Sequence, residues 1–185
     1  MKRIFLAVTL LFLSHNVFAL EVAGVPVEQT VTVNNQQLKL NGSGIRKKFF
    51  VKVYIGSLYA GKHLSSPSEV LQDAGDKLIR MNFLHSKVGK EKITEAFAEG
   101  FVKNAPEVSA SGEGKKFLSF FTDDFVKGDT VDLALGADGT VVAKHNGKVL
   151  GSMKSNSLTH GILAIYFGDK PADEGLKKGM LGIQQ

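Results

Sequence analysis

Apolar and polar residues alternate along the first part of the chain that can form strands. The alternation runs from Glu21 to Leu40 and is interrupted at Asn34-Asn35, which is typical of a meander of short strands. A longer strand is predicted from Phe49 to Ala60, where β-branched and aromatic residues are enriched, and Gly61 ends it.

Helical periodicity begins farther along the chain. Ser66 followed by Pro67 indicates a helix start, because serine caps helices and proline suits their first turn. The clearest amphipathic helix runs from Lys90 to Asn104, where apolar residues recur every four positions, and Pro106 stops it. Further helices are predicted from Lys115 to Phe121, from Leu158 to Phe167 and, as a short final helix, from Pro171.

Strand patterns lie between these helices. They run from Lys77 to Leu84, Thr130 to Leu135, Thr140 to His145 and Lys148 to Met153. Asp138-Gly139 and Asn146-Gly147 join the last three strands and favour tight turns, since glycine tolerates positive φ. Because strands and helices are grouped in runs, we predict one α+β domain with a largely antiparallel sheet and helices packed on it.

The first residues have the pattern of a secretory signal peptide. Lys2 and Arg3 precede an apolar run from Ile4 to Leu13, and Val17-Phe18-Ala19 closes the segment with a cleavage-site pattern. The run is roughly half of the ~20 residues that a membrane-spanning helix needs. We therefore predict a signal peptide over 1–19, a domain over 20–185, a periplasmic or secreted location, and no transmembrane segment after cleavage.

Composition excludes several classes of function. The formal net charge of +5 includes Lys2 and Arg3, and the other lysines are scattered among acids, so no nucleic-acid partner is expected. The chain has no cysteine, which excludes disulfides and thiol chemistry. Its histidines are dispersed without neighbouring carboxylates, so we expect no metal site and no cofactor.

The most unusual stretch is the sequence from Asn41 to Tyr59. We interpret its first part as a glycine-rich turn that delivers Arg46 to the mouth of an aromatic strand. In a regular strand Phe50, Lys52 and Tyr54 share one face, a mixture that suits the wall of a pocket. The alternative is that Arg46 is a solvated turn residue and Tyr54 a core tyrosine.

Three blocks of the chain resemble the chalcone isomerase-like family. They are Gly44-Ile45-Arg46 with the strand from Phe50 to Tyr59, Phe120 to Asp129, and Ile165 to Pro171 with Leu176-Lys177. The resemblance spans nearly the whole chain beyond residue 19. It implies an open-faced β-sandwich, in which a large antiparallel sheet is covered by a layer of helices with a ligand cleft between them.

The resemblance implies two kinds of function. Enzymes of the family cyclise a chalcone with the help of an arginine, whereas a non-catalytic branch binds fatty acids through the same arginine and a tyrosine. Arg46 stands at the position of the family's arginine. At Tyr54 the chain is similar to the fatty-acid-binding branch, and Arg80 aligns loosely with a catalytic lysine of the enzymes. The family's catalytic tyrosine is absent from Ser86 to Lys90, and Ile165-Tyr166 stands near its catalytic threonine.

We therefore predict a non-enzymatic protein that binds a fatty acid or similar lipophilic anion, with Arg46, Tyr54 and Arg80 as ligand-binding residues. One or two phenylalanines should line the channel for an acyl chain, from the candidates Phe50, Phe83, Phe97, Phe101 and Phe117. The first alternative is an isomerase of the intramolecular lyase type that acts on a chalcone-like enone. The second is an assembly partner with a vestigial cleft.

Overall fold

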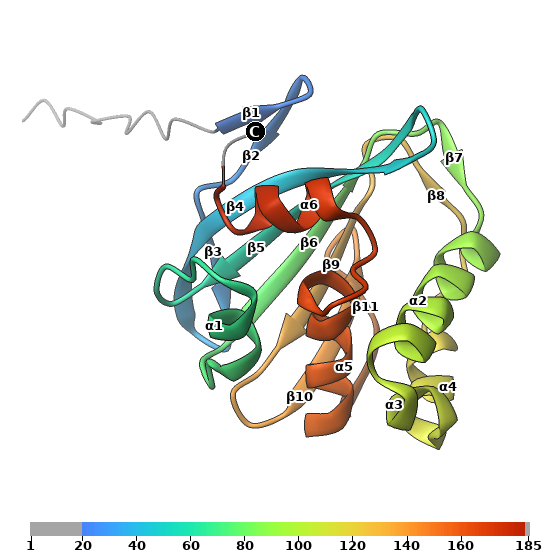
Figure 1. Ribbon diagram of the computed structural model, residues 1–185. Helices are drawn as coiled ribbons and strands as arrows, with labels where there is room; N and C mark the ends of the chain where they lie inside the picture. The colour runs from blue at the N-terminus through green and yellow to red at the C-terminus, as the bar shows by residue number, and fades with distance from the viewer. Residues whose placement is uncertain (1–19, 184–185) are drawn as a thin grey trace, which may run out of the picture.

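A curled antiparallel sheet of seven strands forms the centre of the computed structural model, which describes residues 20–183 (Figure 1). The strand order is β11-β10-β9-β6-β5-β4-β3, and every neighbouring pair is antiparallel. The strands are β3 (Thr30–Val33), β4 (Gln36–Lys48), β5 (Val51–Ala60), β6 (Lys77–Phe83), β9 (Thr130–Leu135), β10 (Thr140–His145) and β11 (Lys148–Lys154). Two small pairs lie outside it: β1 (Leu20–Val22) with β2 (Val25–Val27), and β7 (Lys87–Val88) with β8 (Phe125–Val126).

Helices cover one face of this sheet (Figure 1). They are α1 (Pro67–Gln72), α2 (Lys90–Asn104), α3 (Pro106–Ala110), α4 (Gly112–Leu118), α5 (Asn156–Phe167) and α6 (Glu174–Met180). The main hydrophobic core lies between the helices and the sheet, and a smaller cluster around Tyr59 lies on the opposite face. The α+β fold class expected from the sequence, a large antiparallel sheet with a layer of helices, is confirmed.

Side-chain caps explain most of the helix starts. Ser66 accepts a hydrogen bond from the backbone N–H of Glu69, and Pro67 occupies the first turn of α1, as the sequence indicates. Ser155 caps α5, which therefore begins two residues before the predicted start. Asp173 caps the final helix, so that α6 begins at Glu174 and Pro171 lies in the preceding loop.

The expected turn at residues 41–44 is wrong, because these residues continue strand β4. A Cβ on Gly42 would collide with the carbonyl oxygen of Gly179, and one on Gly44 would lie 2.6 Å from that of Leu176. The glycines therefore let the backbone of α6 approach the strand closely. The turn comes later, at Phe49-Phe50, so Phe50 does not share a strand face with Lys52 and Tyr54.

The first helix predicted after α2 is also displaced. It was expected from Lys115 to Phe121, but α4 spans Gly112–Leu118 because Ser111 caps it by accepting a hydrogen bond from the N–H of Gly114. The predicted signal peptide at 1–19 lies outside the described residues. Within residues 20–183, no helix is both long enough and apolar enough to cross a membrane.

Candidate ligand-binding site

Strand pairing places Arg46 and Tyr54 side by side on the helix-covered face of the sheet. Arg46 of β4 is the register partner of Tyr54 of β5, and Tyr54 in turn pairs with Phe83 of β6. The register of β4 shifts immediately after Arg46, a β-bulge of the kind that redirects side chains near sites. The side chain of Arg46 remains 24% exposed, whereas Tyr54 is buried.

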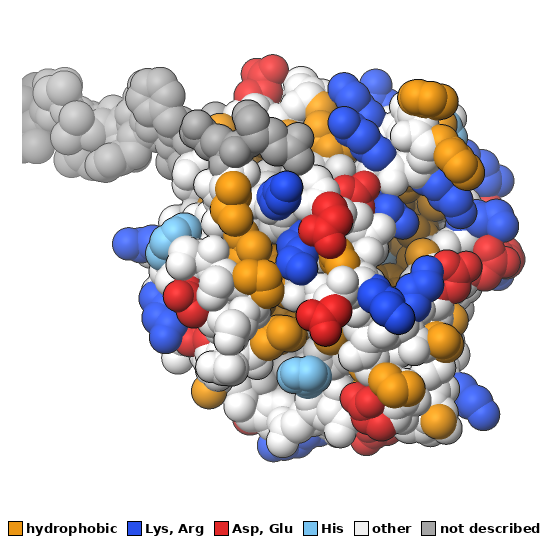
Figure 2. Space-filling view, in the orientation of Figure 1, with side chains coloured by type: hydrophobic (Ala, Val, Ile, Leu, Met, Phe, Trp, Pro, Cys, Tyr) orange, Lys and Arg blue, Asp and Glu red, His pale blue; other side chains and the backbone are white. Residues whose placement is uncertain are grey.

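The two residues border a cavity of about 460 Å³ between the sheet and helix α2. The space-filling view shows this hollow with hydrophobic side chains at its floor and lysine and arginine side chains around its mouth (Figure 2). Its size lies within the range of about 300–1,000 Å³ that is usual for small-molecule sites. The apolar wall consists of Val53, Met81, Val88, Ile93, Ala96, Phe97, Ile165, Pro171 and Ala172.

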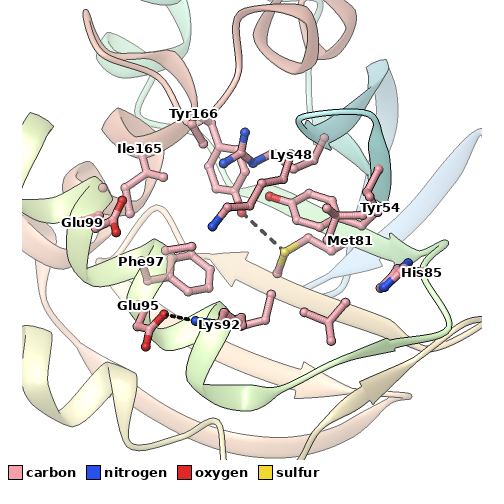
Figure 3. Close-up of a pocket in the computed structure, with 18 of the residues that line it drawn as sticks. Lys48, Tyr54, Met81, His85, Lys92, Glu95, Phe97, Glu99, Ile165 and Tyr166 are labelled. Atoms are coloured by element: carbon pink, nitrogen blue, oxygen red, sulfur yellow. Dashed lines mark hydrogen bonds and ion pairs between the residues drawn. The ribbon is translucent and has the colours of Figure 1, made fainter.

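Two tyrosine hydroxyls meet at the inner end of the cavity. Figure 3 shows the hydroxyls of Tyr54 and Tyr166 pointing toward each other, and the Tyr166 hydroxyl donates a hydrogen bond to Sδ of Met81 at 3.6 Å. Burial raises the pKa of Tyr54, although the charge of Arg46 lowers it in part. Burial and the adjacent Tyr54 raise the pKa of Tyr166 well above its ordinary value. Both hydroxyls therefore remain protonated at neutral pH and can donate to an anion.

Asp173 holds Arg46 in place at the edge of the cavity. Its Oδ2 lies 3.5 Å from Nη1 of Arg46 and accepts a hydrogen bond from the backbone N–H of Lys47, while its Oδ1 caps α6 through Leu176. The same Nη1 donates to the carbonyl oxygen of Lys47 at 3.1 Å. Because a guanidinium has five N–H donors, several remain for a ligand.

The mouth of the cavity is positively charged. Six lysine and arginine side chains line the cavity against two glutamates, and each of the glutamates is paired with one of the lysines. In residues 20–183, no carboxylate lies within ion-pair distance of Lys48 or Lys170. Figure 3 shows Lys48 extending across the mouth toward Tyr166. Arg46 and Lys87 are paired with Asp173 and Asp124, so among the described residues the unpaired charges of Lys48 and Lys170 are the ones that favour an anionic ligand.

The structure does not bring Arg80 to this cavity. Arg80 lies on the opposite face of the sheet, where Nε and Nη2 donate to the two carboxylate oxygens of Asp132 at 2.7 and 2.9 Å. Nη1 donates to Glu28 at 2.6 Å, and the guanidinium lies 5.9 Å from the ring centroid of Tyr59. Strand alternation separates Arg80 from its neighbour Met81, which does line the cavity. Arg80 thus forms a structural ion pair on the other face.

The candidate phenylalanines lie in three different places: the cavity wall, the core and an exposed turn. Phe97 lines the cavity, whereas Phe83, Phe101 and Phe117 are buried in the core and do not line it. Phe50 lies at the β4–β5 turn with its side chain fully exposed. Of the five candidate rings, only that of Phe97 lines the cavity, so Phe97 is the one that stays a candidate for contact with an acyl chain.

Tyr166 and Lys48 are site residues that the sequence analysis missed. Tyr166 lies in the block from Ile165 to Pro171, near the position of the family's catalytic threonine. Helix α5 is buried on most of its surface, so its periodicity does not reveal which side chains face a cavity. The available signal was a polar hydroxyl within the apolar run from Gly161 to Phe167.

Comparisons with known proteins identify the family and agree with the fold. A family model described as chalcone isomerase-like matches residues 19–182. The chain is 26% identical over 143 residues to fatty-acid-binding protein 1 of Arabidopsis thaliana, a match that covers 71% of this chain and 51% of the relative. The chain thus spans about half the length of that relative. A crystal structure of an Arabidopsis thaliana fatty-acid-binding protein has the same fold, with a TM-score of 0.63 and 20% identity over 85% of this chain and 92% of the other.

Proposed function

The chain belongs to the chalcone isomerase-like family, and from this premise we propose that it is a non-enzymatic protein that binds a fatty acid or a similar lipophilic anion. One observation carries the proposal: an apolar cavity ends at Arg46, Tyr54 and Tyr166, with Lys48 across its mouth. An acyl chain matches the walls of this cavity, and a carboxylate matches its polar end.

The polar end suits a carboxylate for a physical reason. A guanidinium presents parallel N–H groups that match the two oxygens of a carboxylate, and partial burial strengthens the charge-assisted hydrogen bonds. The hydroxyl of Tyr54 can add a directional hydrogen bond, and that of Tyr166 can do so in place of its hydrogen bond to Met81, since both hydroxyls remain protonated at neutral pH. Asp173 pairs with the arginine at the edge of the cavity and orients it.

The Arabidopsis thaliana relatives support the acyl ligand, because fatty acid binding is part of their names. The two tyrosines are donors rather than bases near neutral pH, so the inner end of the cavity can bind an anion directly. The cyclisation of a chalcone-like enone is the competing outcome of the experiment below.

The ligand experiment compares Arg46→Gln with Lys39→Gln, an exposed position on the same strand that does not line the cavity. We expect purified protein to take up a fluorescent fatty acid, and we expect Arg46→Gln to weaken the affinity by about 1.5–3 kcal/mol, the range for a hydrogen bond to a charged group. Lys39→Gln should leave the affinity unchanged. Native mass spectrometry of the same protein should detect a bound acyl chain.

Two results would contradict the proposal. One is the absence of both a bound acyl chain and fatty-acid uptake in a protein that is folded by circular dichroism. The other is turnover of a chalcone panel that is lost in Arg46→Gln, which would assign the site to an isomerase.

We also propose that the protein acts outside the cytoplasm, on the basis of the signal-peptide pattern in residues 1–19. The expected product of cleavage after Ala19 begins at Leu20. Intact-mass measurement of protein recovered from periplasmic and medium fractions tests this, and recovery of the uncleaved chain from the cytoplasm alone would contradict it.

A further inference from the structure

The turn between β4 and β5 exposes two adjacent phenylalanines. Phe49 is 87% exposed, Phe50 is 101% exposed, and Val51 beside them is 44% exposed. Burial of such side chains is strongly favourable, so a pair of fully exposed aromatic rings on a single turn is a typical mark of an interaction surface. We call residues 47–52 the β4–β5 tip.

The backbone of the tip shows that Phe49 is poorly suited to the turn itself. Phe49 has a φ of 55°, a left-handed conformation that is unfavourable for a bulky side chain. In the other described turns, positive φ is adopted by glycine, asparagine or alanine, as at Asn34, Asn146 and Gly147. The fold would therefore be served better by a smaller residue at position 49. This contrast indicates that the exposed rings have another role.

Positive charge surrounds the rings. Lys47, Lys48 and Lys52 belong to the tip, and among the described residues none of these lysines has a carboxylate within ion-pair distance. Figure 1 places β7 and β8 beside this end of the sheet, where β8 ends in the half-exposed Val126 and Lys127 follows. The space-filling view shows hydrophobic side chains at this corner with basic side chains next to them (Figure 2).

We propose that the β4–β5 tip docks onto an anionic lipid surface, with Phe49 and Phe50 inserted among the acyl chains and the lysines against the headgroups. The combination of exposed aromatic rings and a basic collar matches the two layers of such a surface. A symmetric contact between two copies through the tip would bring the lysines of both copies together, and their repulsion disfavours that alternative.

The tip and the cavity share residues. Lys48, Phe49 and Val51 also line the rim of the cavity described above, so a docked molecule would present the mouth of its cavity to the lipid. Passage of a fatty acid directly between membrane and cavity rests on the proposed function, whereas docking itself does not. Vesicles that contain no free fatty acid therefore test docking alone.

Tryptophan fluorescence gives a direct test, because the chain contains no tryptophan. In Phe50→Trp we expect the emission to shift to shorter wavelength, and to be quenched by brominated acyl chains, with phosphatidylglycerol-containing vesicles and much less with pure phosphatidylcholine. Val102→Trp is the matched control, since Val102 is 62% exposed on α2 and does not line the cavity. No shift at position 50, or equal shifts at both positions, would overturn the proposal.

Vesicle flotation of the double variant Phe49→Asn/Phe50→Ser gives a second test. Binding to anionic vesicles should fall at least about tenfold, because burial of a single aromatic side chain already accounts for that factor. Thermal stability should stay equal or rise, since asparagine adopts positive φ readily. Unchanged flotation of this folded variant would overturn the proposal.

Charge variants distinguish a lipid surface from a protein partner. Lys47→Gln and Lys52→Gln should each weaken vesicle binding by about fivefold, in line with the usual contribution of a lysine near an anionic membrane. Phe50→Ser should lose vesicle binding but keep fatty-acid affinity in solution, whereas Arg46→Gln should lose the affinity and keep vesicle binding. Vesicle binding that is insensitive to the lysines and to salt would overturn the charge-dependent docking.

Discussion

Burial raises the pKa of the tyrosines and so keeps their hydroxyls protonated, the state in which a hydroxyl can donate to an anion. The chain has three tyrosines, and Tyr54, Tyr59 and Tyr166 are all buried. Burial raises the pKa of each, to about 12 for Tyr59, because ionisation would place a charge where water is excluded. Tyr59 lies on the opposite face and donates to the carbonyl oxygen of Glu28 at 3.0 Å. Burial thus keeps the hydroxyl protonated both at Tyr59, in the smaller core cluster, and at Tyr54 and Tyr166, in the candidate site.

Alkaline titration of the folded protein tests these pKa values. We expect the near-ultraviolet absorbance of tyrosinate to stay flat through pH 10, where unfolded tyrosine ionises. Because the unfolded chain loses its phenolic protons first, the stability contributed by the tyrosines is complete below pH 10 and is lost as pH rises through the folded-state value, about 12 for Tyr59. Ionisation near pH 10 while circular dichroism still reports native structure would contradict the burial argument.

At the scale of elements, the contact between β4 and α6 builds the edge of the site. Gly42 and Gly44 of the strand lie against the backbone of α6, and Gly179 of the helix lies against Gly44. This close approach brings the cap of α6, Asp173, to Arg46 and to the backbone of Lys47. Packing of one helix against one strand therefore determines the orientation of the arginine.

Gly44→Ala should destabilise the protein. The added Cβ would lie 2.6 Å from the carbonyl oxygen and 2.8 Å from Cα of Leu176, so helix and strand must separate, at a cost of about 1–3 kcal/mol for such overpacking. Chemical denaturation measures the change, and ligand affinity should also fall because Asp173 moves with the helix. Gly61→Ala is the control, since a Cβ there meets nothing within 4 Å. Equal stability of both variants would show that the contact tolerates a side chain.

At the scale of the whole molecule, the sheet separates two environments. The helix-covered face holds the main core and the cavity, and the other face holds the cluster around Tyr59 with the ion pair of Arg80 and Asp132. Helices α2 and α5 both contribute to the cavity wall, and so do strands β5 and β6. A ligand in this position contacts both layers of the fold and should stabilise the molecule as a unit.

Fatty acid should therefore raise the midpoint of thermal unfolding. At about 100 times the dissociation constant, ligand linkage adds about 2.7 kcal/mol. In a domain of this size each kcal/mol corresponds to about 2–4 °C, so the expected rise is about 5–10 °C. Differential scanning fluorimetry of delipidated protein measures it, and Arg46→Gln should show a smaller rise at the same ligand concentration. An unchanged midpoint in the parent protein at saturating ligand would contradict a shared site between the layers.

The sequence by itself determined the elements whose signals are local. The bounds of α2 agree with the predicted Lys90 to Asn104, and the turns at Asp138-Gly139 and Asn146-Gly147 join β9, β10 and β11 as expected. These agreements arise because helical periodicity, a helix-stopping proline and turn dipeptides determine the bounds of an element through residues only a few positions apart. The α+β class, the family resemblance and the candidates Arg46 and Tyr54 were likewise accessible from the sequence.

Only the tertiary structure decided which side chains share the cavity. The register of the β4–β5 hairpin puts Arg46 beside Tyr54, and the pairing of β6 with β5 sends Arg80 to the other face, because alternate residues of a strand point in opposite directions. Tyr166 enters the site from a helix that is buried on most of its surface, so its periodicity cannot show that direction. Glycines 42 and 44 indicate a turn when considered alone, and only the approach of α6 reveals them as a packing surface within a strand.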